Sequence, residues 1–224
     1  MAATQFFGER IKRNEDPRLL TGQALFVDDV SLPRMGHVAF VRSPHAHAKL
    51  LEVDVSEAVG MPGVIGVYTA EDLGDYWQHG PLLVPPPPVE GMVFNQRTQV
   101  PLAKGKVRYV GEPVAVVVAD NRYLAEDAAE MVFVDYEILE TAVSLSQAVQ
   151  PDAPKVHADV DLVHGDLNNV NAHVVQVKGD GARFDDIAAS AHHVIKRSFY
   201  YDHGSSARME CRGIVADWDR RAQR

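Results

Sequence analysis

Short alternating patterns of hydrophobic and polar residues predict strands in the first part of the chain. Over residues 48–55, Glu52 and Asp54 alternate with Leu51 and Val53, which is the two-residue period of a strand with one exposed face. Segments rich in β-branched and aromatic residues predict further strands at 36–42, 64–68, 106–110, 113–119 and 132–136.

Between the last two of these strands, a helical period replaces the strand period. Leu124, Ala128 and Met131 fall on one face of a helix and Glu126 falls outside it, so this helix is expected to cover a sheet. We expect Asp120 to cap its first turn. The order strand, helix, strand predicts an α/β (or α+β) fold.

Two shorter helical segments are expected earlier in the chain. Ser56 is a candidate cap for a helix that must stop before Pro62, because proline cannot continue a helix. Thr69 followed by Asp72 resembles a capping signal for one further turn.

Glycine and proline mark the turns and the irregular segments. Ser43-Pro44-His45 and Gly111-Glu112 are expected to turn between strands, and residues 1–35 form an arm with turns at Asp16-Pro17 and Pro33-Arg34. The stretch 74–101 contains Pro85, Pro86, Pro87 and Pro88, which favour polyproline II. A loop of this length is expected to cover a partner or to be functional.

Periodicity weakens over residues 140–170, and Pro151 and Pro154 lie there, so we expect a domain boundary near 145–155. Beyond it, the pattern predicts a short helix at 184–191. Strands are predicted on either side of that helix, at 172–178, 193–201 and 212–218.

Composition narrows the class of protein. The 224 residues carry a net charge of -9 without basic runs, which argues against a nucleic-acid partner. The single cysteine, Cys211, excludes an internal disulfide framework and an iron–sulfur cluster held by this chain alone. Residues 1–12 do not resemble a secretory signal, and the apolar run 114–119 is too short to span a membrane. A cytoplasmic protein is expected.

Histidines and the cysteine are the first candidates for chemistry. His45 and His47 would share one face of a strand, as metal ligands do, but no further ligand lies nearby in sequence, so a structural role is favoured. His192 and His193 would point to opposite faces of an extended segment.

Cys211 lies near Arg208 and Arg212, which could lower a thiol pKa, and His203 is the only nearby base. A small buried residue on a strand is favoured over a nucleophile. The adjacent acidic residues of the chain are expected to be solvated; they are Asp28-Asp29, Glu126-Asp127 and Asp185-Asp186. From chemistry alone, the sequence contains no recognisable catalytic motif.

Several ordered motifs nevertheless resemble one family. Residues 13–22 (RNEDPRLLTG) with 26–29 (FVDD), 42–48 (RSPHAHA), 62–67 (PGVIGV) and 107–135 resemble the start of the molybdenum-binding subunits of xanthine dehydrogenase, aldehyde oxidase and CO dehydrogenase. Several motifs in a fixed order over about 120 residues are far more specific than a single pattern.

The resemblance implies an extended N-terminal arm at residues 1–19 and an α/β hammerhead domain at 20–145. Residues 150–224, with Gly179-Asp180 and 209–213 (MECRG), resemble an incomplete beginning of the molybdopterin-binding domain. It also implies a hydroxylase that oxidises a small substrate with water-derived oxygen and passes electrons through 2Fe-2S clusters to FAD. The molybdenum–molybdopterin cofactor would belong to the assembled complex, and FAD and 2Fe-2S would belong to partner subunits.

The family's cofactor-contacting loops and catalytic glutamate have no counterpart in this sequence, so no catalytic, cofactor-binding or metal-binding residue is assigned. Arg208 stands where relatives often have proline, and the strand ending at 217–219 would leave an unpaired edge. We therefore expect a scaffold component whose sheet is completed by the remaining molybdenum-subunit polypeptide. A truncated, non-enzymatic module without cofactor is the alternative.

Overall fold

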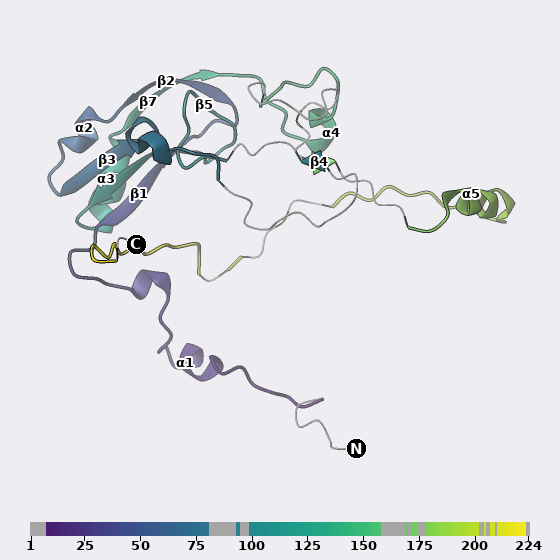
Figure 1. Ribbon diagram of the computed structural model, residues 1–224, viewed down its shortest axis with the longest axis horizontal. Coiled ribbons are helices and arrows are strands. Elements are labelled where there is room, and N and C mark those ends of the chain that lie inside the picture. The colour runs from purple at the N-terminus through teal and green to yellow at the C-terminus, as the bar shows by residue number, and fades with distance from the viewer. Residues whose placement is uncertain are drawn as a thin grey trace. The chain divides into compact units, whose positions relative to one another are not determined.

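The computed structural model describes residues 8–80, 93–94, 99–157, 169, 172–173, 178–201, 204, 207–208 and 210–222 (Figure 1). The chain divides into two compact units. One comprises Gly36–Val194, and the other combines Met1–Met35 with Ile195–Arg224. Each is described by itself.

The larger unit contains two antiparallel three-stranded sheets. The first sheet consists of β1 (His37–Arg42), β3 (Val64–Thr69) and β6 (Pro113–Ala119), in the order β1-β6-β3. The second consists of β2 (Ala48–Asp54), β5 (Lys106–Val107) and β7 (Phe133–Ile138), in the order β5-β2-β7. A two-stranded pair joins β4 (Val93–Phe94) to β8 (Ala172–His173).

Short helices lie between these strands and after the last of them. They are α2 (Ser56–Val59), η2 (Glu71–Tyr76), α3 (Arg122–Glu130), α4 (Leu145–Ala148) and α5 (Gly181–Ser190). The amphipathic α3 buries Ala125 and Ala128. The smaller unit contains α1 (Asp16–Leu20) and the 3-10 turn η1 (Val27–Asp29).

Two clusters of small aliphatic side chains form the core of the larger unit. Ala115 and Val117 of β6 pack with Ala58 of α2 and Ala128 of α3. The other cluster surrounds Val107 of β5. Val53 of β2 and Val134 of β7 pack against both clusters, so the two sheets share one continuous core.

The mixed α/β architecture and the strands predicted before residue 140 are confirmed, with local differences. Asn121, not Asp120, caps α3: its Oδ1 accepts a hydrogen bond from the Leu124 amide at 3.0 Å. The Asp120 amide is held at 2.9 Å by the carbonyl of Gly63. The strand expected at 106–110 ends at Val107, because the Arg108 amide donates to the Glu112 carboxylate instead of to a neighbouring strand.

The strands predicted at 193–201 and 212–218 are wrong, since both segments lack regular structure. Their large apolar residues are exposed, including Phe199 at 93% and Ile214 at 91%. A strand is stabilised by hydrogen bonds to a neighbour, and the described residues supply none to these segments.

Asp16-Pro17 begins the short helix α1 and does not form an isolated turn. The turn at Pro33-Arg34 is confirmed. The prolines 85–88 and residues 174–177 of the predicted strand 172–178 lie outside the described residues.

In the smaller unit, the N-terminal arm is held by a residue late in the chain. The Val27 amide donates a hydrogen bond to the Glu210 carboxylate at 2.9 Å. A Cβ at Gly213 would lie 2.6 Å from a methyl group of Val27, so a glycine is required for this close approach.

Candidate functional site

Buried polar side chains mark the first candidate site. Among the described residues, these are Ser43, His47 and Glu112, whose exposed fractions are 2%, 6% and 2%. They belong to two segments, Arg42–His47 after β1 and Arg108–Glu112 before β6, which we call the polar turn. Burial of polar groups is unfavourable unless they are hydrogen-bonded, so their partners define what this site does.

The backbone joins the two segments of the polar turn. The Ser43 amide donates to the Glu112 carbonyl at 2.9 Å, and the Gly111 amide donates to the Ser43 carbonyl at 2.8 Å. The Arg42 guanidinium donates to the Gly111 carbonyl at 2.8 Å. Gly111 has φ +87°, a conformation that favours glycine. The sequence prediction of turns at both segments is confirmed.

Glu112 closes the second segment with its side chain. Its carboxylate accepts the Arg108 amide, and its own amide donates to the Tyr109 carbonyl at 3.2 Å. Burial raises the pKa of Glu112, while the Arg108 hydrogen bond and charge oppose this rise. Burial also raises the pKa of Tyr109, and the nearby Glu112 charge raises it further. Sequence reasoning missed this residue, although a glutamate at the start of an apolar strand was the available signal.

His45 and His47 make different contacts and do not converge. His47 Nδ1 lies 2.7 Å from the Glu140 carbonyl, and because a carbonyl only accepts, this nitrogen carries the proton. Its Nε2 is buried and has no hydrogen-bond partner among the described residues. The His45 ring contacts Tyr136 edge-on, with 4.9 Å between centroids. The described residues form no group of three or more potential metal ligands.

The remaining candidates are dispersed. The rings of His192 and His193 touch at 4.3 Å between centroids, so the expectation that they point apart is wrong, because their segment is not a strand. Cys211 is exposed, contrary to the expected buried position. His203 lies outside the described residues. The three acidic pairs are exposed, as expected.

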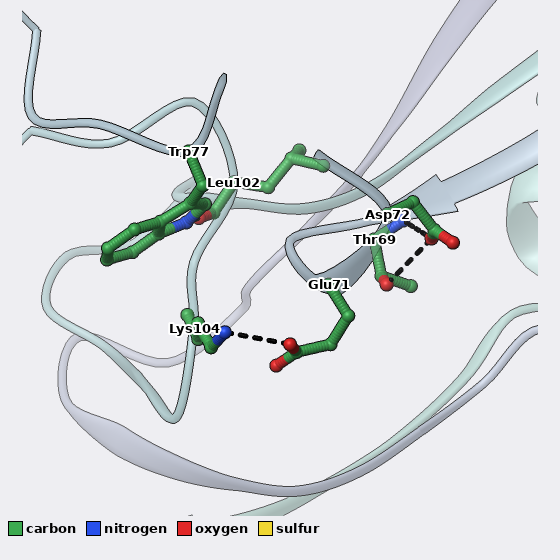
Figure 2. A network of polar contacts seen from close by, with 6 residues as sticks. All are labelled: Thr69, Glu71, Asp72, Trp77, Leu102 and Lys104. Carbon is green, nitrogen blue, oxygen red and sulfur yellow. Dashed lines mark hydrogen bonds and ion pairs between the residues drawn. The ribbon is translucent and has the colours of Figure 1, made fainter. Parts of the chain in front are cut away.

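A surface hollow of about 310 Å³ is the second candidate site. It is lined by β2, the start of η2 and residues 103–105. At its rim, Lys104 Nζ lies 2.7 Å from Glu71 Oε2 and 5.8 Å from the centre of the Trp77 ring (Figure 2). The Trp77 indole donates to the Leu102 carbonyl at 2.9 Å. No local sequence pattern predicts this hollow, because its residues come from separate segments.

A second contact fixes the rim of the hollow. Asp72 accepts hydrogen bonds from the amide and the hydroxyl of Thr69, at 2.7 and 2.9 Å (Figure 2). These bonds lower the pKa of Asp72. The capping role predicted for Thr69 and Asp72 is wrong, because Thr69 donates both bonds and η2 begins after Ala70 without a side-chain cap.

The hollow does not fit the anionic phosphate of a pterin cofactor. Its lining carries the carboxylates of Glu52 and Glu71 against one ammonium, Lys104, which Glu71 already neutralises. Phosphates are bound by clustered amides, arginines or unpaired lysines. Among the described residues, the hollow therefore offers no cradle for that phosphate.

Two sheets with an intervening capped helix, joined by a buried polar turn, define an α/β hammerhead scaffold. A family profile described as "Aldehyde oxidase and xanthine dehydrogenase, a/b hammerhead domain" matches residues 21–140. The chain is 38% identical over 221 residues to the carbon monoxide dehydrogenase large chain of Afipia carboxidovorans, covering 96% of this chain and 26% of that protein. It is 35% identical over 212 residues to the nicotine 6-hydroxylase large subunit of Paenarthrobacter nicotinovorans, covering 95% of this chain and 24% of that protein.

Solved structures of molybdenum hydroxylases also resemble this chain. A Cu,Mo-CO dehydrogenase chain matches with a TM-score of 0.62 and 37% identity, covering 83% of this chain and 23% of that chain. Quinoline 2-oxidoreductase from Pseudomonas putida 86 matches with a TM-score of 0.56 and 42% identity, covering 62% of this chain and 17% of that chain.

The chain belongs to the aldehyde oxidase and xanthine dehydrogenase hammerhead family, and its relatives are large subunits of molybdenum hydroxylases of the CO dehydrogenase type. It spans about a quarter of the length of the curated relatives that it matches. None of the described helices is long and apolar enough to cross a membrane.

Proposed function

We propose that this chain works as the opening portion of the large subunit of a molybdenum hydroxylase. The similarity to CO dehydrogenase and nicotine 6-hydroxylase large subunits carries this proposal, because it runs over 95–96% of the chain and includes the motifs in order. In this proposal, residues 20–145 are the hammerhead domain and 150–224 begin the molybdopterin-binding domain.

The role proposed for the chain is to support and enclose the cofactor of the assembled enzyme. The polar turn and the shared core support this role, because they join the two sheets to each other. The enzyme would oxidise a small substrate with water-derived oxygen, and electrons would pass through 2Fe-2S clusters to FAD on partner subunits in the cytoplasm. The remaining large-subunit polypeptide would supply the cofactor-contacting loops.

Affinity purification of the tagged chain from its native cells tests this function, with an unrelated tagged protein as control. Molybdenum would be measured by mass spectrometry, pterin and FAD by fluorescence, and iron by colorimetry. We expect all four to be enriched in stoichiometric amounts. A chain recovered without molybdenum or partner polypeptides would contradict the proposal.

The alternative is a scaffold module that binds no cofactor. The self-contained core of the larger unit favours it, since both sheets already bury Val107 and Val117 completely. A chain recovered as a bare, folded monomer in the same purification would support this alternative.

A further inference from the structure

The sheet β1-β6-β3 has an apolar outer face. Strand pairing places Val38 and Phe40 of β1 beside Val118 and Val116 of β6, and Tyr68 of β3 beside Val116. Val38, Phe40, Ile65 and Tyr68 are 54%, 47%, 57% and 43% exposed. We call these six residues the outer face.

The opposite face of the same sheet is covered. Val41, Val67 and Val117 point inward and pack with Ala58 of α2 and Ala128 of α3. An antiparallel sheet with one face in water normally carries polar residues on that face. Here β6 has the sequence PVAVVVA, which is apolar on both faces, as in strands that are buried on both sides.

The outer face is also smooth. Gly66 carries no side chain there, and the Tyr68 ring lies over it, with the hydroxyl 2.7 Å from the position of a Cβ at Gly66. Arg42 lies beside it, with its guanidinium 5.2 Å from the centre of the Phe40 ring. Apolar surface with few charges is typical of permanent interfaces.

We infer that the outer face is the docking surface for the remaining large-subunit polypeptide. The inference rests on the proposed function. The comparisons indicate the occupant. The region matched by this chain makes up only 24–26% of the relatives' large subunits, so about three times as much polypeptide accompanies it there. Two parts of one subunit are always present together in equal amounts. Apolar interfaces are typical of such permanent association.

The test uses the portion of the Afipia carboxidovorans CO dehydrogenase large chain beyond the region matched here, co-expressed with the full chain. Val38→Glu places a charge on the outer face. Phe133→Glu is the matched control, because Phe133 is 60% exposed and lies in β7 of the other sheet. We expect Val38→Glu to weaken binding by about tenfold or more and Phe133→Glu to leave it unchanged. Circular dichroism would check that both variants fold.

Hydrogen exchange on the same complex gives a second measurement, with protection expected along β1 and β3. Equal binding by both variants would overturn the docking surface, while leaving the proposed function in place. Absence of binding by the unsubstituted chain, or its self-association through Val38, would also overturn it. The molybdenum content of the native purification judges the proposed function separately.

Discussion

At the scale of single residues, the buried Glu112 of the polar turn makes the stability of the fold depend on pH. Burial raises the pKa of Glu112 above its ordinary value of 4.5, so the folded state binds the proton of Glu112 more strongly than the unfolded state does. Its contribution to stability is therefore greatest below the unfolded pKa and falls as pH rises through the folded pKa.

We predict that Glu112→Gln removes this dependence. Thermal unfolding between about pH 4 and about pH 7 would show the melting temperature of the wild-type chain falling, relative to that of the variant, as pH rises. Glu112→Ala should lower stability by about 2–4 kcal/mol at the acid end of this range, because it leaves the Arg108 amide unpaired and opens a cavity. Parallel pH profiles for wild type and Glu112→Gln would refute the assignment.

His45 and His47 are expected to have structural roles. The double substitution to alanine should leave the metal content unchanged, measured by mass spectrometry of the purified chain. His47→Ala alone should destabilise the fold, since its Nδ1 hydrogen bond to Glu140 is lost, whereas His45→Ala should have a smaller effect. A metal lost on double substitution would contradict this prediction.

At the scale of elements, α3 depends on its cap. Asn121→Ala should lower the free energy of unfolding by about 1 kcal/mol, because the Leu124 amide loses its acceptor. Asn121→Asp keeps an acceptor and serves as the control. Urea unfolding measures both, and equal midpoints for Asn121→Ala and wild type would count against the cap.

The arm of the smaller unit depends on Gly213. Gly213→Ala should displace Val27. The hydrogen bond from the Val27 amide to the Glu210 carboxylate would then weaken, and hydrogen exchange of that amide would become faster. Val27→Ala combined with Gly213→Ala makes room for the added methyl and should restore slow exchange. Unchanged exchange in the single variant would show that the arm is held elsewhere.

Elements with complete local patterns were predictable, and those that depend on distant partners were not. β6 and α3 follow from their own periodicity and packing against each other. Segments 193–201 and 212–218 have strand-like composition, but a strand forms only with a neighbour, which no local pattern reveals. Likewise, Glu112 and the Lys104–Glu71 pair come together only in the folded chain, so the sequence did not identify either site.

At the scale of the whole molecule, the proposed function makes the chain a scaffold within a larger subunit, with the chemistry supplied by other polypeptides. The purified chain should therefore show no dye-linked oxidation of aldehydes, purines or CO. The native complex from the same cells serves as the positive control for the assay. Turnover by the isolated chain would mean that it holds a catalytic site of its own.

The order β1-β6-β3 also has a consequence for synthesis on the ribosome. β1 and β3 both pair with β6, which begins at Pro113 and is made well after Thr69, the last residue of β3. Until then the two earlier strands have no central partner, and their valines and aromatic residues are exposed to other nascent chains. Because such non-local pairing is slow, we expect the emerging chain to aggregate unless these strands are shielded until β6 has left the exit tunnel.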